Sequence, residues 1–336
     1  MKDATNGRRR FVATAGFAAL AATLGEALTG REVRADDDHD VDKFIRAVQR
    51  ARLFDLSHLW DENSPIAGVN PPYEMTLNKT HANFTTPDQP GTRGQFGDGG
   101  KLSFTSEIQK FSGQLGAPSI DALGHIGRNG KLFGGVDAAA STSDLRGIGR
   151  SGVGAHLDIA HYPNELLVNR GVLLDVARFV NRSSAPLADT VGITGEMLSQ
   201  TARHQGVRLR RGDTVLIRTG WGQFFASSPQ TYAGPNSAGV GVDGAKFLIS
   251  SGARVVGNDT LTFEVRPPLA GTPGGPDFEV FPVHMLVIAD NGINIIENFN
   301  LEEIAAAGEY EFALVVPPLK VRGGTGSALR SFALVP

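Results

Sequence analysis

The sequence predicts an α/β fold with a mixed sheet and flanking helices. Glycine supplies 42 of the 336 residues and proline another 18, whereas the usual glycine share is about 7%. This composition favours short strands joined by many turns over a helical bundle. Strand-length apolar runs alternate along the chain with longer helical periods. A chain of this length can also bury a substantial core.

The elements follow from apolar periodicity and end signals, taken along the chain. The helix expected at 194–205 is the clearest, because Thr194 is a favoured N-cap residue and Glu196 lies in the first turn. Residues 285–289 are too few and too apolar to decide between helix and strand. The predicted strands are 53–56, 171–176, 214–219, 254–257, 293–296, 311–316 and 329–335, and the predicted helices are 41–52, 194–205, 242–251 and 301–307.

Residues 61–100 are rich in Pro, Gly, Asn and Thr and show no sustained period. A loop of that length in a compact domain is usually functional or flexible, so we interpret it as a lid or an oligomer contact. No internal repeat or linker divides the chain. We therefore predict a single domain over residues 36–336.

Residues 1–35 have the features of an export signal. Three arginines and Phe-Val (residues 8–12) precede a short Ala- and Gly-rich apolar run, and small residues follow near Ala35. The arginine pair points to the twin-arginine route, and the run is too short to span a bilayer. We expect a periplasmic or secreted protein. The chain has no cysteine, which excludes disulfides and thiolate sites.

The charge of the mature chain argues against nucleic-acid and membrane partners. Residues 36–336 hold 26 Lys and Arg against 32 Asp and Glu, a net charge of −6, with no basic run. Nucleic-acid binding would require a basic patch. The expected partner is a small-molecule substrate.

The stretch 114–125 (QLGAPSIDALGH) contains the first candidate site. It places Asp121 and His125 four residues apart in an apolar run, where an ionised carboxylate is costly without a partner. A metal ion or an acid/base pair would satisfy that carboxylate. The alternative is that Asp121 caps a turn and His125 packs in the core.

A second cluster lies at 281–298, where His284 opens an apolar segment and Glu297 ends a short predicted strand. The Asn-Gly pair at 291–292 makes a turn between them. If the segment after His284 is helical, the return strand brings Glu297 back beside it. Two imidazoles and two carboxylates would then converge, which suits zinc or manganese.

These segments occur in the order seen in the cyclase family of metal-dependent hydrolases, which includes bacterial kynurenine formamidase, isatin hydrolase and trans-dienelactone hydrolase. The similarity extends over about residues 53–335. It implies a swivelling β/β/α fold, a homodimer or homotetramer, and hydrolysis of an amide, imide or lactone bond at a divalent metal. The residues that resemble the family are 55–58, 121–125, 212–221, 256–259, 284, 297 and 318–327.

The sequence departs from the family's metal motif, His-x-Gly-Thr-His-x-Asp-x-Pro-x-His. Asp121 and His125 are retained, but Leu115 and Ser119 occupy the other two histidine positions. Gln114 and Ser119 are possible oxygen ligands, although neutral oxygens bind zinc less well than imidazole does. The glycine, threonine and proline positions hold Ala117, Pro118 and Leu123.

By this resemblance Asp121, His284 and Glu297 hold a weakly bound zinc or manganese ion. His125 is the acid/base, and Glu297 shares the catalytic assignment. The predicted function is an exported metal-dependent hydrolase of a small cyclic or N-acyl compound that uses metal-activated water. The alternative is a family member that has lost the usual metal site and binds a small ligand or performs non-hydrolytic chemistry.

Four further residues have two interpretations each. His58 follows Asp-Leu-Ser and is a possible additional site residue. Trp221 and the loop around Tyr73 are possible walls for a cyclic substrate, although ordinary core packing is the expectation for Trp221. Glu264 is a possible pocket residue, although a surface carboxylate is the expectation.

Overall fold

The computed structural model describes residues 38–66, 68, 70–71, 73–79, 105–114, 116–145, 148–150 and 156–336. The predicted export signal and Leu115 lie outside these residues. The chain divides into two units, residues 1–50 and 51–336. The first contains helix α1 (Asp38–Arg50), which confirms the first predicted helix. None of the helices in the described part of the chain has the length and apolar character needed to cross a membrane.

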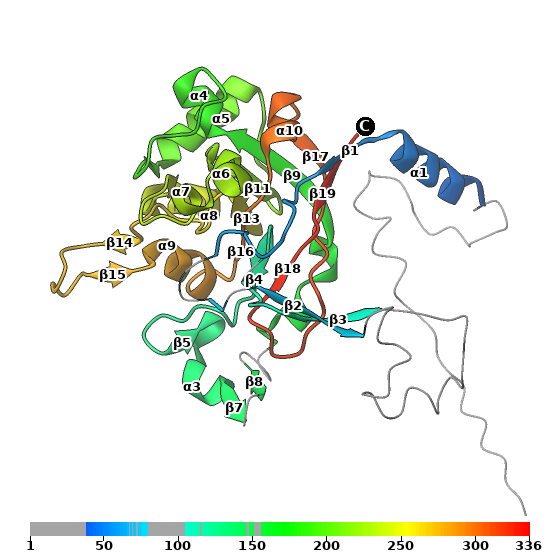
Figure 1. Cartoon of the computed structure of the whole chain (residues 1–336). Coiled ribbons are helices and arrows are strands. Elements are labelled where there is room, and N and C mark those ends of the chain that lie inside the picture. The colour runs from blue at the N-terminus through cyan, green and yellow to red at the C-terminus, as the bar shows by residue number, and fades with distance from the viewer. Residues whose placement is uncertain are drawn as a thin grey trace, which may run out of the picture. The chain divides into compact units, whose positions relative to one another are not determined.

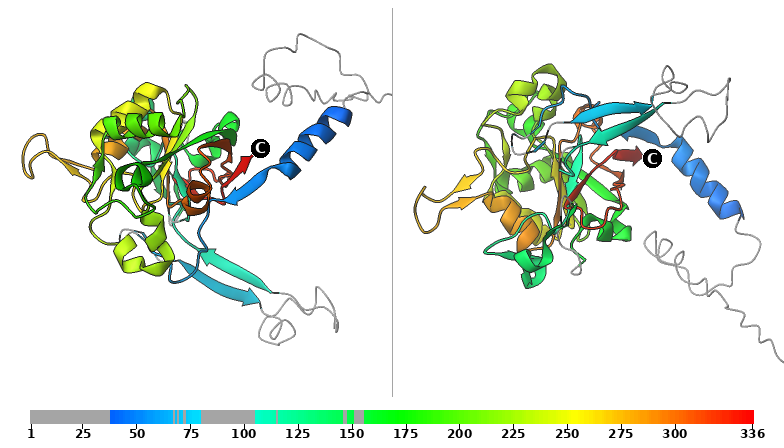
Figure 2. Two further views of the ribbon diagram at one scale, coloured as in Figure 1. Left: turned by 90° about the horizontal axis from the view of Figure 1, so that it is seen from above. Right: turned by 60° about the horizontal axis from the view of Figure 1, so that its bottom comes forward.

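A nine-stranded mixed sheet forms the centre of the second unit (Figures 1 and 2). Four adjacent strands, β9, β11, β13 and β16, run parallel, and antiparallel strands extend the sheet on both sides. The mixed α/β fold predicted from the sequence is thereby confirmed. Across the sheet the strands are β1 (Arg52–Asp55), β19 (Phe332–Val335), β17 (Glu311–Val315), β9 (Val168–Asp175), β11 (Thr214–Arg218), β13 (Val255–Asn258), β16 (Asn294–Glu297), β4 (Ser119–Asp121) and β18 (Gly326–Ala328).

The sheet is buried on both faces, because alternate residues of its parallel strands enter two different hydrophobic clusters. Val215 and Ile217 of β11 pack with helices α5 (Gly195–Gln205) and α8 (Val242–Ser251). Leu216, between them, packs with helix α10 (Glu302–Ala306) and the β17–β19 side of the sheet. Strands covered on both faces read as continuous apolar runs, which explains why the sequence predicts these strands well.

Several short elements were not predicted. Strand β2 (Glu74–Lys79) pairs with β3 (Ser106–Lys110), so the prediction of a loop throughout 61–100 is wrong for residues 74–79. The two-residue strands are too short to show a period of their own and form by pairing with one another, β5 with β6, β10 with β12 and β14 with β15. The remaining strands and α-helices are β5 (Lys131–Leu132), β6 (Val136–Asp137), α3 (Ala138–Ser141), β7 (Ser143–Leu145), β8 (Ile148–Arg150), α4 (Val176–Asn181), β10 (Gly192–Ile193), α6 (Phe224–Ser227), α7 (Pro229–Tyr232), β12 (Gly239–Val240), β14 (Leu269–Ala270), β15 (Glu279–Val280) and α9 (Pro282–His284).

Candidate metal centre

Two of the predicted ligands lie on neighbouring strands. Strand β4 runs antiparallel to β16, and Glu297 stands opposite Ser119 while Ile296 stands opposite Ile120. Because side chains alternate between the two faces of a strand, Asp121 and Glu297 project from the same face as diagonal neighbours. Ile120 and Ile296 point to the other face, into the cluster that contains α10.

His284 comes from the helical segment on that same face. It ends α9, and a π-helical turn (Met285–Ala289) follows directly, so the segment that the sequence left undecided is helical. The turn predicted at 291–292 then leads into β16. This return places the Nε2 atom of His284 3.1 Å from Glu297 Oε1 and 3.9 Å from Asp121 Oδ2.

Asp121, His284 and Glu297 thus form one buried group. One ligand atom from each lies within 4.8 Å of the others, and this is the only such group of His, Asp and Glu side chains in the parts of the chain that the structure describes. The three residues are 3%, 4% and 8% exposed. One imidazole nitrogen and two carboxylates are a donor set that suits a zinc or manganese ion.

Glu264 completes the arrangement in a role that the sequence did not predict. It is 1% exposed, so the expectation of a surface carboxylate is wrong. Its Oε1 atom lies 2.6 Å from Nδ1 of His284, and it accepts the backbone N–H of His284 at 3.0 Å. A carboxylate that binds Nδ1–H leaves the Nε2 atom facing the other two carboxylates, which is the usual orientation of a metal-binding histidine.

The group carries more negative charge than its one imidazole can balance. Burial, and next the charge of Glu297, raise the pKa of Asp121 well above its usual value. Burial lowers the pKa of His284, but hydrogen bonds to Glu264 and Glu297 outweigh it and raise that pKa to about 10. Buried carboxylates that crowd one another in this way favour a bound cation.

His125 lies at the exposed side of the group. Its Nε2 atom is 3.9 Å from Asp121 Oδ1, and its side chain is 30% exposed. Burial, and next the positive charge of His284, lower the pKa of His125 to about 4. The imidazole is therefore neutral at neutral pH and retains a lone pair that can take up a proton.

The two possible oxygen ligands are engaged elsewhere. The Gln114 side chain accepts from Ser112 and donates to Thr325 at 2.9 Å. The Ser119 hydroxyl donates to the backbone oxygen of Gln114 at 3.2 Å. Ser119 is buried opposite Glu297 on the face that carries Asp121. A ligand role for either residue stays a prediction.

His58 lies in an aromatic layer next to the carboxylate group. Its ring stacks on the Phe225 ring with 4.1 Å between the ring centroids, and Phe225 packs edge-on against Tyr232. The Tyr232 hydroxyl donates to the side-chain oxygen of Asn298, the residue after Glu297. Burial lowers the pKa of His58 to about 4, although a hydrogen bond with the Phe299 backbone raises it. The buried Nε2 atom of His58 has no hydrogen-bond partner among the residues described.

The two aromatic candidates for a substrate wall differ in position. Trp221 is 5% exposed within the α5–α8 core, and its indole N–H donates to the Leu187 backbone oxygen. This is the core packing that the sequence led us to expect. The Tyr73 ring lies beside the Trp60 ring, with 4.9 Å between the ring centroids, and the Trp60 ring also packs edge-on against Phe111.

The chain also matches known proteins in sequence and in fold. The model of the Cyclase family ("Putative cyclase") matches residues 54–265. An isatin hydrolase from Roseibium aggregatum is 30% identical over 155 residues, which are 43% of this chain and 52% of that protein. The chain therefore aligns with about half the length of this relative.

Solved structures share the fold over most of the chain. A structure described as a novel cyclase superposes with a TM-score of 0.68 at 26% identity and covers 86% of this chain and 89% of its own. Isatin hydrolase A from Labrenzia aggregata, bound to benzyl benzoate, gives a TM-score of 0.62 at 20% identity and covers 88% of this chain and 99% of its own.

Proposed function

Because this chain belongs to the Cyclase family, we propose that it is a metal-dependent hydrolase that opens an amide, imide or lactone bond of a small cyclic or N-acyl compound. The single observation that carries the proposal is the orientation of His284. Its Nδ1 atom is held by Glu264 at 2.6 Å, while its Nε2 atom faces Glu297 and Asp121.

The residues that would hold the ion are Asp121, His284 and Glu297, and zinc or manganese fits their donor atoms. When bound there, a divalent ion polarises a substrate carbonyl and lowers the pKa of water. Glu264 fixes the tautomer and the ring orientation of His284. The Phe263 backbone N–H donates to Glu297 Oε1 at 2.7 Å and holds this carboxylate in place.

His125 is the proposed acid/base. It is the member of the site with the most exposed side chain, and its neutral imidazole can accept the proton of the attacking water. The protonated ring then returns that proton to the nitrogen or oxygen of the leaving group. A general acid/base typically contributes about 10²- to 10⁴-fold to the rate.

The proposed substrate class rests on the relative named isatin hydrolase. Isatin is a cyclic amide, and its hydrolysis breaks the ring C–N bond and gives a carboxylate and an amine. We therefore place a small cyclic amide, imide or lactone first among the substrates, and an N-formyl aryl amine second.

The test combines metal analysis with a substrate panel. Purified protein is loaded with Mn²⁺ or Zn²⁺, desalted and analysed for metal, and then assayed with isatin, a cyclic imide, an unsaturated lactone and an N-formyl aryl amine. We expect about one ion per chain and chelator-sensitive hydrolysis of at least one compound. The His284→Ala variant should lose both properties, whereas His204→Ala, on helix α5, should keep them.

The alternative, a member that has lost its metal, gives the opposite result. It predicts no bound ion after loading and the same ligand-binding behaviour in wild type and His284→Ala. An ion that binds without hydrolysis of any panel member would leave the metal centre in place and contradict the substrate class.

Export by the twin-arginine route and assembly into a homodimer or homotetramer are also proposals. The supporting feature for export is the Arg-Arg-Arg-Phe-Val run at residues 8–12. Replacement of Arg8, Arg9 and Arg10 by lysine should retain the protein in the cytoplasm if the route is used, and light scattering of the purified protein measures the assembly.

A further inference from the structure

A cavity that is separate from the carboxylate group lies at the opposite end of the parallel strands. Its volume is about 850 Å³, which is within the range of small-molecule pockets. Gly212, Arg254 and Asn294 contribute to its wall from the starts of β11, β13 and β16. Glu297, by contrast, is the last residue of β16. Neither Glu297 nor the other residues of the candidate metal centre line this cavity.

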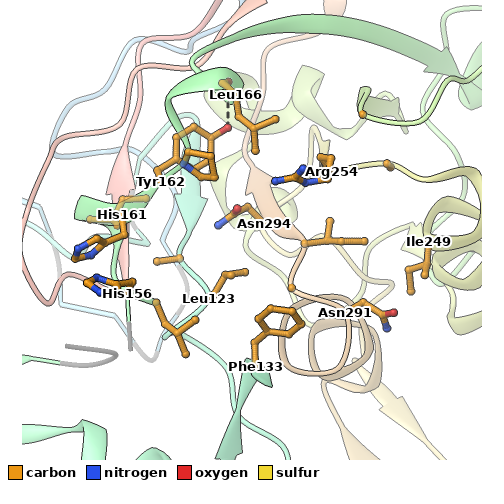
Figure 3. A pocket seen from close by; sticks show the side chains of 18 of the residues that line it. Leu123, Phe133, His156, His161, Tyr162, Leu166, Ile249, Arg254, Asn291 and Asn294 are labelled. Atoms are coloured by element: carbon orange, nitrogen blue, oxygen red, sulfur yellow. Dashed lines mark hydrogen bonds between the residues drawn. The ribbon is translucent and has the colours of Figure 1, made fainter. Parts of the chain in front are cut away.

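One part of the cavity wall is apolar. Leu123, Leu166, Ile249 and Ile293 line it, together with the rings of Tyr162 and Phe133. Figure 3 shows all of these except Ile293 with labels, and the labelled side chains surround a common space. Such a wall suits a flat hydrocarbon body, because aromatic and branched side chains lose water-exposed area when a ring packs against them.

The position of Phe133 depends on a glycine. Gly292 has a φ of +64°, and a Cβ atom there would lie 2.5 Å from the Phe133 ring. The ring therefore packs directly on the turn that precedes β16. A side chain at this position would collide with the ring, so this part of the wall requires glycine.

The charged groups of the cavity favour an anion. Arg254 is half exposed, and the only carboxylate it approaches among the described residues is Glu165, at 3.9 Å. This distance is beyond a hydrogen bond, so its guanidinium has donors free for a ligand. Arg211 adds a second positive charge to the lining.

The one acidic side chain in the lining is already satisfied. Asp158 is 3% exposed, one of its oxygens is bonded to Nδ1 of His161, and the other accepts the backbone N–H of Gly323 at 2.5 Å. It therefore does not compete with a ligand for Arg254. The His161 ring that it orients packs edge-on against His156 at 4.3 Å and forms one end of the cavity (Figure 3).

Asn294 supplies a polar group near the middle of the cavity. Figure 3 shows it between Tyr162 and Leu123. Its Nδ2 atom donates to the backbone oxygen of Asp121 at 2.7 Å. This bond fixes the amide plane and leaves the second Nδ2 hydrogen as a donor for a ligand.

We propose that this cavity is a second binding site, specific for small aromatic carboxylates. The carboxylate pairs with the Arg254 guanidinium, a geometry that permits two parallel hydrogen bonds. The aromatic body packs against Tyr162, Leu123 and Ile293. The site binds its ligand without chemical change, and its existence does not depend on the proposed hydrolase activity.

The test compares 2-naphthoate with its uncharged isostere 2-naphthamide by titration calorimetry, in the presence of a chelator so that no metal offers the carboxylate another site. We expect naphthoate to bind at least about tenfold more tightly than the amide, because a charge-assisted pair replaces a neutral contact. Arg254→Gln should abolish this preference. Arg203→Gln, on helix α5 outside the cavity, is the matched control and should retain it.

A second measurement starts from the wild-type protein. Nuclear Overhauser contacts from bound naphthoate to the methyl groups of Leu123, Ile249 and Ile293 should appear in the wild-type protein. Ile249→Trp, which fills the cavity, should remove both the contacts and the binding. Equal affinity of Arg254→Gln and wild type for naphthoate, or contacts at other methyl groups, would overturn the proposal. Intact naphthoate binding by Ile249→Trp would also overturn the proposal, even if that variant changes its oligomeric state.

Discussion

Glu264 binds His284 twice through one oxygen, accepting from the backbone N–H at 3.0 Å and contacting the Nδ1 atom at 2.6 Å. The imidazole is thereby fixed at both its backbone and its ring. Its tautomer and its direction follow from a residue that would not itself touch the ion.

This relationship predicts the effect of Glu264→Ala. The ring of His284 should lose its orientation, and Mn²⁺ affinity should fall by about 10- to 100-fold, as is usual when the hydrogen-bond partner of a metal-binding histidine is removed. Glu264→Gln, which retains an acceptor oxygen, should lose less. Calorimetric Mn²⁺ titration measures both, and the exposed Glu165→Gln is the control. An unchanged Mn²⁺ affinity in Glu264→Ala would contradict the role of His284 as a ligand of the ion.

His125→Gln should separate proton transfer from metal binding. We expect hydrolysis to fall by about 10²- to 10⁴-fold while the metal content stays that of the wild type, because the His125 ring is 3.9 Å from Asp121 and lies at the exposed side. Asp121→Asn should lose metal and activity together. Metal analysis and turnover are measured on the same preparations. Loss of metal from His125→Gln would make His125 a ligand.

His58 should make stability depend on pH. Burial lowers its folded-state pKa from 6.5 to about 4, so between these values the unfolded chain binds a proton that the folded chain does not. The stability that neutral His58 contributes is complete above pH 6.5 and is lost as the pH falls toward 4. The total is roughly 3 kcal/mol.

His58→Gln has no such titration. The difference in unfolding free energy between wild type and His58→Gln should therefore shrink by that amount across the same pH range, as measured by urea denaturation at each pH. A difference that stays constant with pH would show that His58 titrates alike in the folded and unfolded chains.

Arg218 should be critical for stability because it is 1% exposed and lies between two acids. Its guanidinium donates to Asp175 at 2.8 Å and to both oxygens of Glu302 at 2.8 and 2.9 Å. Arg218→Met leaves buried Asp175 without this partner and should cost about 3–5 kcal/mol. The double variant with Asp175→Asn should recover part of the loss in denaturant unfolding. A double variant that loses the sum of the two single effects would contradict this coupling.

The sequence predicted the long elements because their signals are local. Strand β11 reads as an unbroken apolar run, and helix α5 has its N-cap in Thr194, whose side chain accepts the backbone N–H of Met197. Strand β4 has only three residues and forms through pairing with strands far along the chain. The local sequence has no apolar period that would predict this strand.

The candidate site was predicted in the same uneven way. Asp121, His284 and Glu297 match family positions, and the structure brings them together. The contact of Glu264 with His284 was not predicted because the two residues are 20 positions apart, and the contact depends on how α9 folds back. An isolated glutamate between Phe263 and Val265 gives no sign of burial beyond its apolar neighbours.

The position of β4 in the sheet links ion release to unfolding at one edge. Among the strands that the structure describes, only β18, which is three residues long, lies beyond β4, and Asp121 is the residue of β4 that stands opposite Gly326. An ion bound by both Asp121 and Glu297 would link β4 to β16. Separation of β4 from the sheet would then require release of the ion. Amide hydrogen exchange should then be slowed in β4 by the ion far more than in β9, where the sheet is closed on both sides.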